Sequence, residues 1–392
     1  MSWLPWESVH AHDTVVATMR QGGVSSQQRL LMVRTRMGEG GNDRVASTLL
    51  RELPRDRFAV DLAVLRTDGH FMTAVPGDVA VHSLGEIRLW RAVVPLGRLV
   101  QRLQPDVVFS MSNGTNIVAI AARALFRGSY RVVLSERNSM IRAEYRVKNW
   151  VLTQLKRLTY ARAEVVTAVS EGVARELVDH VRVAPERVRV VYNPVVTPDV
   201  SSLAAEPVDH PWFAAETQVI LGCGRLVPQK DFASLIRAFA RIQVSIPYAR
   251  LVILGEGKER RRLEMLAREL GVYSAVWLAG YQTNPFKFMA RSSCFVLSSR
   301  HEGLPGALIQ AMACGAAVVS TDCPSGPSEI VTDGVDGLLC PVGDIPLLAG
   351  AIERVLGDRE LRESLGANAL TNAQRFHLDR SLGRYISALM DG

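Results

Sequence analysis

Short apolar runs alternate with stretches of helical hydrophobic spacing along most of the chain. The first unit begins with an apolar run at residues 29–35, which predicts a buried strand. A glycine loop that includes Gly41 follows, and apolar residues then recur at helical spacing over residues 43–53. Asn42 or Asp43 is placed to cap this helix. The unit is therefore expected to be a strand, a glycine loop and a helix.

The same alternation continues to residue 192. The expected strands lie at residues 59–65, 107–110, 131–135, 165–169 and 188–192. The expected helices lie at residues 89–103, 116–126 and 145–162. Strands that alternate with helices favour a parallel sheet with helices on both faces.

A second alternating series follows a break in the pattern. Residues 194–217 contain four prolines, so we expect a domain linker there, at residues 196–215. The next expected strands lie at residues 219–223, 251–254, 276–279, 294–297 and 316–320. The next expected helices lie at residues 232–242, 259–270, 306–314 and 346–356. The fold class is α/β, with two doubly wound parallel-sheet (Rossmann-like) domains facing across a cleft.

These boundaries divide the chain into five parts. Residues 1–28 show no clear period and are expected to be a weakly ordered extension. The two domains are expected at residues 29–195 and 216–375, and residues 376–392 are expected to form a helix that crosses back to the first domain. Ligands of such sheets bind beyond the carboxyl ends of the strands, so the chemistry should lie in the loops after strands.

Composition excludes several classes of protein. With 48% hydrophobic and 22% charged residues in 392, the chain has material for two cores and is not a disordered chain. The longest charge-free run, residues 303–321, contains a proline, a glutamine and three glycines, which argues against a membrane-spanning helix. The five cysteines include no C-x-x-C pair, and no secretory signal pattern opens the chain, so a cytoplasmic protein is expected.

The formal net charge is +7, with only five lysines. Basic surfaces attract nucleic acid, anionic lipid headgroups or phosphorylated small molecules, and charge alone does not choose among them. The motifs point to a phosphorylated small molecule, so nucleic acid is not an expected partner.

The segment at residues 300–315 predicts a short helix with both ends visible in the sequence. Pro305 suits the first helical position and Gly315 the position just past the end. The two residues before Pro305 have no side-chain oxygen that would cap the free amides. Such a start favours a phosphate or pyrophosphate, with Glu302 on the approaching loop and Gln310 on the helix. An ordinary buried helix capped by a neighbour or by water is the alternative.

A second strand end runs into a helix start at residues 221–231. Gly224 allows close approach to the backbone, and Arg225 and Lys230 bring two cations to the same loop. This combination predicts a cradle for phosphate. In the alternative interpretation, Arg225 pairs with a carboxylate and Lys230 is solvated.

Several short motifs occur in a fixed order along the chain. In the second half they are GRL…QKD at 224–231, ILGEG at 253–257, LAG at 278–280, SSRHEGLP at 298–305, AMACG at 311–315 and STDCPSGPSEI at 320–330. The first half adds the glycine loop at 38–41, AVSEG at 168–172 and VYNP at 191–194. Taken together, they resemble the E-x7-E (family 4) retaining glycosyltransferases, which have the GT-B architecture and use nucleotide-sugar donors. The resemblance covers residues 29–372 and is dense from 222 to 341.

The resemblance implies roles for individual residues. Arg225 and Lys230 would hold the donor diphosphate and stabilise it as it leaves, and Glu302 would lie against the donor sugar. The donor-binding positions are Gly41, Gly224, Gly303, Leu304, Pro305, Gly306, Ala307 and Gln310. A UDP-sugar is the expected donor. No D-x-D triplet supplies a metal clamp, so transfer is expected to need no metal and no cofactor.

Two positions depart from the family pattern. Gln310 stands where the second acid of the motif normally contacts the ribose, although its carbonyl oxygen still accepts a hydrogen bond from a hydroxyl. Glu136, Arg137 and Asn138 stand in a loop where many relatives carry a histidine. These polar groups are expected to face the acceptor or the donor sugar, or else to form a network within the loop.

The class of acceptor is inferred from two basic, aromatic stretches. They lie at residues 88–102 and 142–162, and the second contains Tyr145, Trp150 and Tyr160. Such helices bind anionic membranes, which fits a glycan or lipid-linked acceptor in polysaccharide or lipopolysaccharide assembly at the inner face of the membrane. Amphipathic helices that cover a sheet are the alternative. A retaining hexosyltransferase is the favoured function. Another GT-B enzyme (epimerase-like or glycogen-phosphorylase-like) and a non-catalytic nucleotide-sugar binder stay open.

Overall fold

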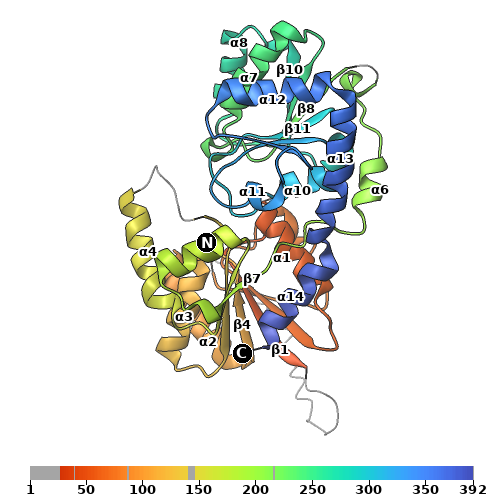
Figure 1. Ribbon diagram of the computed structural model, residues 1–392. Coiled ribbons are helices and arrows are strands. Elements are labelled where there is room, and N and C mark those ends of the chain that lie inside the picture. Colours follow the sequence, from red (N-terminus) through yellow and green to blue (C-terminus); the bar gives the residue numbers. More distant parts are fainter. Residues whose placement is uncertain (1–26, 39, 86–87, 140–145, 215–216, 392) are drawn as a thin grey trace, which may run out of the picture.

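The computed structural model describes residues 27–391 except residues 39, 86–87, 140–145 and 215–216. The weakly ordered extension predicted for residues 1–28 therefore lies almost entirely outside the described residues. The described chain forms two α/β lobes, one above the other in Figure 1. No helix among these residues is long and apolar enough to span a bilayer.

Each lobe contains one sheet in which every neighbouring pair of strands is parallel. The first sheet has the order β3-β2-β1-β4-β5-β6-β7, with β1 Gln28–Arg34, β2 Phe58–Val64, β3 Ala80–Ser83, β4 Val107–Ser110, β5 Arg131–Glu136, β6 Val165–Ala168 and β7 Val188–Val190. The second has the order β10-β9-β8-β11-β12-β13, with β8 Val219–Cys223, β9 Arg250–Leu254, β10 Val276–Gly280, β11 Cys294–Leu297, β12 Val318–Thr321 and β13 Leu338–Cys340. The predicted fold class is confirmed.

Helices cover both faces of each sheet. In the first lobe they are α1 Gly41–Glu52, α2 Val93–Leu103, α3 Asn113–Phe126, α4 Arg146–Tyr160 and α5 Glu171–Glu176. Beyond it they are α6 Val200–Ala205, α7 Phe232–Ser245, α8 Arg260–Glu269, α9 Phe286–Met289, α10 Gly306–Ala313, α11 Pro327–Ile330, α12 Ile345–Gly357, α13 Arg359–Ala373 and α14 Leu378–Met390. The sequence pattern missed the edge strand β3, because its residues are largely exposed and form no apolar run.

Alternation along β1 explains how the first lobe is layered. Successive side chains of a strand point to opposite faces of the sheet. Leu30 and Met32 lie in a buried cluster with residues of α1 and α14, whereas Leu31 and Val33 lie in another cluster with residues of α2 and α3. Because both faces are covered, β1 has the continuous apolar sequence that is typical of parallel sheets.

The segment predicted as a linker is folded against the second lobe. It contains α6, and Asn284 donates from Nδ2 to the carbonyl of Leu203 at 2.8 Å. The ring of His210 stacks on Trp277 with centroids 3.9 Å apart. The segment of residues 196–214 therefore includes ordered structure and is not a bare linker.

The chain crosses between the lobes twice, and the two crossings pair with each other. The backbone amides of Val195 and Val196 both donate to the carbonyl of Phe376, and Leu378 donates to Val196 at 2.9 Å. Beyond this point α14 packs on the first lobe, where Tyr385 is buried (Figure 1). Any movement of one lobe against the other must therefore act on this paired crossing.

Candidate active site

The loop after β8 is shaped by glycines that allow backbones to touch. Gly224 has φ +157°, and a Cβ atom there would lie 3.1 Å from Cε of Lys230. At Gly255, φ is +132° and a Cβ atom would lie 2.0 Å from the carbonyl oxygen of Gly224. Gly255 thus needs to be glycine for conformation and for space, whereas Gly224 needs to be glycine for its conformation, since its neighbour is the end of a flexible side chain. The GRL and ILGEG motifs are one unit, in which the β9 loop supports the β8 loop.

Lys230 and Glu302 form an ion pair, although they are 72 residues apart. Nζ of Lys230 lies 2.5 Å from Oε1 of Glu302, and the two side chains are 15% and 8% exposed. The hydroxyl of Ser299 donates to the same oxygen at 2.6 Å. No described residue is bonded to the other oxygen, Oε2. The structure therefore brings together two residues that the sequence assigned separately to phosphate and sugar.

Arg225 is exposed, and its side chain makes no hydrogen bond or ion pair within the described ranges. Lys230, in contrast, is paired with Glu302. The alternative interpretation of the sequence had the reverse, with Arg225 paired and Lys230 solvated. The guanidinium N–H groups of Arg225 are thus available to a ligand, whereas the Lys230 ammonium already contacts Glu302.

Helix α10 begins behind Glu302 without a side-chain cap. Pro305 is the N-cap and Gly306 the first helical residue, so the prediction that Pro305 opens the helix was wrong by one position. The carbonyl of Pro305 accepts from Leu308 at 3.1 Å, which places Pro305 just outside the helix. Gly315 follows the end with φ +74°, as predicted for the residue after a helix. Gln310 is half-buried on this helix.

Glycines also allow the two lobes to touch beside Glu302. A Cβ atom at Gly303 would lie 2.4 Å from the carbonyl oxygen of Arg137, in the first lobe. A Cβ atom at Gly172 would lie 2.6 Å from Oγ of Ser325, in the second lobe. The donor loop and the loop after β5 are therefore in direct contact. The motif glycines at these two positions serve the contact between lobes.

Glu329 links the lobes by a set of bonds that the sequence did not reveal. Both of its oxygens accept from the backbone amide of Glu171 at 2.9 Å, at the start of α5. The hydroxyl of Tyr192 donates to Oε1 at 2.7 Å. Burial, with the Glu329 carboxylate beside it, raises the pKa of Tyr192 to about 12. Glu329, Glu171 and Tyr192 belong to the PSEI, AVSEG and VYNP motifs, so the sequence marked these residues. It did not show that they bond to one another, because the motifs are distant in sequence.

Glu136, the last residue of β5, belongs to an internal network, which is the second of the two arrangements expected for this segment. Glu136 is fully buried, and its Oε2 accepts from Nζ of Lys156 at 2.6 Å and from the hydroxyl of Tyr160 at 3.0 Å. Tyr160, expected at a membrane-facing surface, is fully buried as well. Since both residues are enclosed by their own lobe, neither is presented to an acceptor.

Arg137 is buried too, and its guanidinium joins three separate segments. It donates to Asn42 beside the glycine loop at 3.1 Å, to Asn193 at 2.5 Å and to the hydroxyl of Tyr385 on α14 at 3.2 Å. Arg137 therefore positions these segments and does not face solvent. Asn138 alone of the three predicted residues is half-buried, and its Cα would lie 3.1 Å from a Cβ atom at Gly303.

Helix α1 directs its first turn toward the second lobe. Its N-cap is Gly40, whose amide donates to Asp43 at 3.1 Å, so the prediction that Asn42 or Asp43 is the N-cap was wrong. Gly41, the first helical residue, is exposed, and a Cβ atom there would meet no atom within 4 Å. The guanidinium of Arg44 lies 5.9 Å from the ring of Phe286, across the lobe boundary.

Burial raises the pKa of Cys223, at the end of β8, to about 11, although Lys230 and Arg44 act in the opposite sense. Cys223 thus lies within electrostatic reach of cations from both lobes. Within the described ranges, no group of three or more His, Cys, Asp or Glu side chains is arranged to hold a metal ion.

Comparisons with known proteins identify the family of this chain. The family model "Glycosyl transferases group 1" matches residues 211–371, and "Glycosyltransferase Family 4" matches residues 39–198. The chain is 31% identical over 353 residues to the N-acetylgalactosamine-N,N'-diacetylbacillosaminyl-diphospho-undecaprenol 4-alpha-N-acetylgalactosaminyltransferase of Campylobacter jejuni, covering 87% of this chain and 93% of that one. It is 35% identical over 210 residues to the lipopolysaccharide core biosynthesis glycosyltransferase LpsE of Rhizobium meliloti, covering 53% of this chain and 59% of that one.

Solved structures show the same fold. HepE of Anabaena in complex with UDP and glucose has a TM-score of 0.79 at 19% identity, over 93% of this chain and 100% of that chain. The matching family models, the relative from Campylobacter and this fold lead to one conclusion. The chain belongs to the family 4, group 1 glycosyltransferases of GT-B fold and is a glycosyltransferase.

Proposed function

We propose that this glycosyltransferase moves a sugar from a UDP-sugar to a hydroxyl of a glycan or lipid-linked acceptor, with retention and without a metal, in polysaccharide or lipopolysaccharide biosynthesis. The observation that carries the proposal is the Lys230–Glu302 pair, with Ser299 on the same carboxylate oxygen. It joins a phosphate-binding cation to an acid whose second oxygen has no described partner. That arrangement suits a donor whose diphosphate and sugar lie side by side.

The donor diphosphate would be neutralised by side chains and backbone. Lys230 has three N–H donors, of which the described contacts use one on Glu302. Arg225 adds a guanidinium from the same loop, and the uncapped start of α10 adds backbone amides. Fixed positive groups at the developing diphosphate charge lower the barrier because they need no reorganisation during the step.

The sugar would lie against Glu302, whose Oε2 would accept from a sugar hydroxyl. The acceptor hydroxyl attacks the anomeric carbon on the face that the diphosphate leaves. The glycosidic bond forms as the bond from the anomeric carbon to the phosphate oxygen breaks, and the hydroxyl proton passes to that oxygen. The nucleoside diphosphate leaves with the proton, so no protein base is required.

Support for a UDP-sugar comes from structures of similar fold. Two structures of Anabaena HepE contain UDP alone or UDP-glucose, at 21% identity to this chain. Support for a lipid-linked acceptor comes from the Campylobacter relative, whose name describes transfer onto a diphospho-undecaprenol-linked sugar. The cytoplasmic, inner-face location belongs to the same proposal.

Helix α4 supports contact with an anionic membrane. It buries a lysine and exposes apolar side chains, the reverse of what is usual for a helix that covers a sheet. Lys156 is buried, whereas one stripe of the helix exposes Trp150, Val151, Leu155 and Leu158. We call these four residues the α4 stripe. Trp150 is 64% exposed and Leu158 is 66% exposed, and Arg157, which precedes Leu158, is exposed as well. Apolar side chains with flanking arginine suit the boundary between anionic headgroups and acyl chains.

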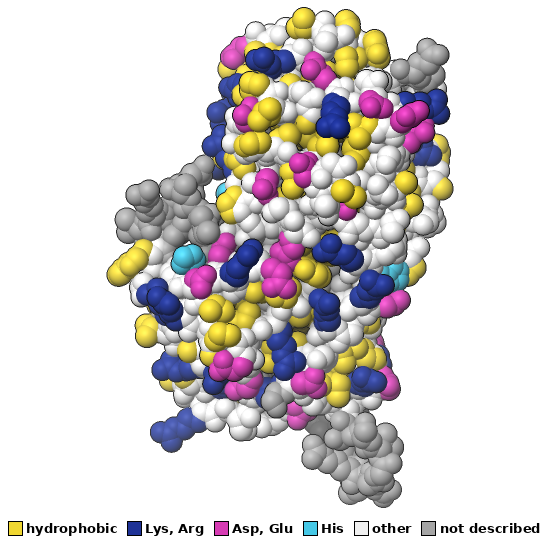
Figure 2. All heavy atoms as spheres, in the orientation of Figure 1, with side chains coloured by type: hydrophobic (Ala, Val, Ile, Leu, Met, Phe, Trp, Pro, Cys, Tyr) yellow, Lys and Arg dark blue, Asp and Glu magenta, His cyan; other side chains and the backbone are white. Residues whose placement is uncertain are grey.

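The net charge alone does not locate this surface. Figure 2 shows basic and acidic side chains interspersed over the face it presents, so the charge of +7 forms no continuous basic patch there. The α4 stripe therefore indicates the proposed membrane-binding surface better than the net charge does. Vesicle sedimentation tests it with Trp150→Glu and Leu155→Glu, against Leu370→Glu on α13, an apolar control that is 43% exposed, as Leu155 is. Both α4 variants should pellet less with acidic vesicles than the control, and equal pelleting of all three would contradict the proposal.

Transfer assays test the reaction itself. UDP and GDP are compared by thermal shift, and then UDP-sugars are offered with a polyprenyl-diphosphate-linked sugar or with a free sugar. We expect stabilisation by UDP, turnover that survives chelator, and an anomeric configuration in the product that matches the donor by NMR. Activity that vanishes in chelator and returns with magnesium would refute metal independence, and an inverted product would refute retention. Binding of UDP-sugars without turnover for any acceptor would favour the non-catalytic binder.

A further inference from the structure

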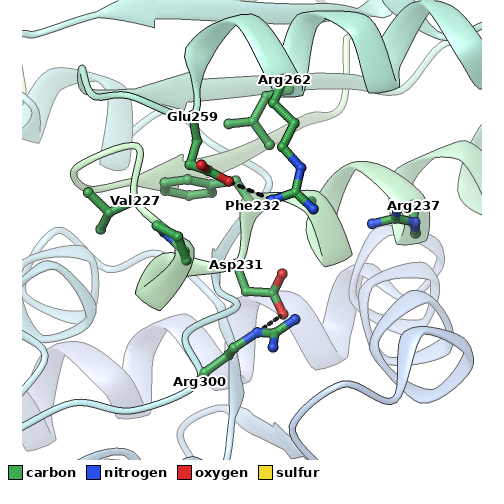
Figure 3. Close-up of a pocket in the computed structure, with 10 residues that line it drawn as sticks. Val227, Asp231, Phe232, Arg237, Glu259, Arg262 and Arg300 are labelled. Carbon is green, nitrogen blue, oxygen red and sulfur yellow. Dashed lines mark hydrogen bonds and ion pairs between the residues drawn. The ribbon is translucent and has the colours of Figure 1, made fainter. Parts of the chain in front are cut away.

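A pocket lies on the second lobe, beside the candidate active site but separate from it (Figure 3). It encloses about 200 Å³ between the starts of α7 and α8 and the loop after β11. Val227, Pro228 and Asp231 line it, but Arg225, Lys230, Glu302 and the residues of α10 do not. The pocket thus shares its loops with the candidate active site without sharing its charged side chains.

Three arginines from three elements line this pocket: Arg237 on α7, Arg262 on α8 and Arg300 after β11. In Figure 3, Arg262 and Arg300 approach Asp231 from opposite sides, with Arg237 beside them. Nε of Arg300 lies 2.9 Å from Asp231, and Nη1 of Arg262 lies 2.8 Å from Glu259. Arg237 is exposed and has no hydrogen bond or ion pair within the described ranges.

These contacts leave the pocket with an excess of positive charge and of hydrogen-bond donors. Two carboxylates face three guanidiniums, and each guanidinium has five N–H donors. Arg262 and Arg300 are 67% and 53% exposed, so their remaining donors are accessible. Planar guanidiniums bind phosphate oxygens in pairs, which makes a phosphate group the best complement to this pocket.

The pocket is connected to the active-site pair through backbone bonds. The amide of Arg300 donates to the carbonyl of Gln229 at 2.9 Å, and Nε2 of Gln229 donates to the carbonyl of His301 at 2.9 Å. The hydroxyl of Ser298 donates to the carbonyl of Lys230 at 2.8 Å. The two loops that form the pocket are therefore locked together immediately before Lys230 and Glu302.

We propose that this pocket binds the phosphate group of a small metabolite, at a site distinct from the donor diphosphate, and that binding changes the affinity of the donor site. The anion would draw Arg300 from Asp231 and engage Arg237. Because the Gln229 and Ser298 bonds join the two loops, a shift of Arg300 is passed to Lys230 and Glu302. Orthophosphate, a sugar phosphate and the nucleoside diphosphate product share the required chemistry, and the test separates them.

Calorimetric titration of the whole protein tests the site. Orthophosphate, glucose 6-phosphate and UDP are titrated into the wild type, into Arg237→Ala/Arg262→Ala and into Arg241→Ala, an exposed arginine one turn along α7 that does not line the pocket. We expect one of the first two probes to bind the wild type and Arg241→Ala equally, and the double variant at least about 10-fold more weakly. UDP should bind at a single site, with similar affinity in all three proteins.

Two results would overturn the proposal: no probe, UDP included, that binds the wild type more tightly than the double variant at millimolar concentration, or displacement of a phosphate probe by the first equivalent of UDP, which would place that probe in the donor site. A second UDP equivalent that is lost in the double variant would support the pocket with the product as its source. The coupling between the two sites is tested by titrating UDP in the presence of a saturating concentration of the probe. The probe should change the affinity for UDP several-fold in the wild type and should not change it in the double variant. Unchanged UDP affinity would refute the coupling. The probe titration does not depend on the proposed function, so the two can fail separately.

Discussion

Among the residues that the structure describes, two lysine–glutamate pairs have almost the same N–O distance, one in each lobe. Lys230 and Glu302 are 2.5 Å apart, with side chains 15% and 8% exposed. Lys156 and Glu136 are 2.6 Å apart, and both side chains are 0% exposed. The first pair joins two loops at the carboxyl ends of strands, whereas the second joins the end of β5 to the inner face of α4.

The surroundings of each pair decide what it does. In the first lobe the hydroxyl of Tyr160 also donates to Glu136, and burial, with the Glu136 charge, raises the pKa of Tyr160 well above its usual value. Tyr160 thus stays protonated and the pair is enclosed. In the second lobe Oε2 of Glu302 has no described partner and Arg225 is exposed. The same two residue types are enclosed in one lobe and partly open in the other, where we propose that they act on the donor.

The largest effect on stability is expected from Lys156→Ala. Removal of one partner leaves the Glu136 carboxylate buried without its counter-ion, which costs about 3–5 kcal/mol of unfolding free energy. Denaturant titration measures the loss, and Lys258→Ala, at an exposed lysine, should stay within about 0.5 kcal/mol of the wild type. Glu136→Leu/Lys156→Met should recover much of the loss. A single variant as stable as the control would show that the buried pair is dispensable.

Lys230→Ala and Arg225→Ala should show the opposite pattern. Each is expected to slow sugar transfer by about 10²–10³-fold, because a fixed positive group at the leaving diphosphate is lost. Arg225→Ala should leave stability within about 0.5 kcal/mol of the wild type, because Arg225 is exposed. Lys230→Ala should cost less stability than Lys156→Ala, because the Lys230–Glu302 pair is not fully enclosed. Initial rates at saturating donor, with denaturant titration of the same samples, make the comparison. Normal turnover in both variants would remove them from the phosphate cradle.

Tyr192→Phe probes the contact between lobes. Loss of its bond to Glu329 should lower unfolding free energy by about 0.5–1.5 kcal/mol at neutral pH. The pKa of Tyr192 is about 12 in the folded protein and about 10 when unfolded, so its contribution is complete below pH 10 and is lost as pH rises through 12. Stability measured from pH 8 to 12 should fall less steeply in the variant, and identical curves would contradict this role.

Gln310→Glu is expected to have the smallest effect. Restoring the family acid on α10 should leave transfer equal to the wild type or a few-fold faster, because a carboxylate is a stronger acceptor for a ribose hydroxyl than an amide. Steady-state constants for the donor measure this change. A clear loss of activity would show that glutamine has a role of its own in this protein.

Local patterns were sufficient to predict most elements and the loops that carry the candidate site residues. Strand β11 lies at the predicted residues, and Gly224, Lys230 and Glu302 lie in loops after strands as expected. These predictions succeeded because apolar runs, glycines and helix ends act within a few residues of one another. The Glu329 and Arg137 networks were not predicted, because their partners lie 137 and 248 residues away in Tyr192 and Tyr385.

Sequence alone determined the alternation of strands and helices, the two-lobed α/β class and the motifs of the donor loops, because these depend on short-range periodicity and backbone freedom. The tertiary structure alone decided which charges are enclosed. Glu136 is the last residue of β5 and Glu302 lies in the loop after β11, yet one is covered by α4 and the other lies at the boundary between lobes. Burial depends on what packs over a side chain, and the residues that pack there come from distant parts of the chain.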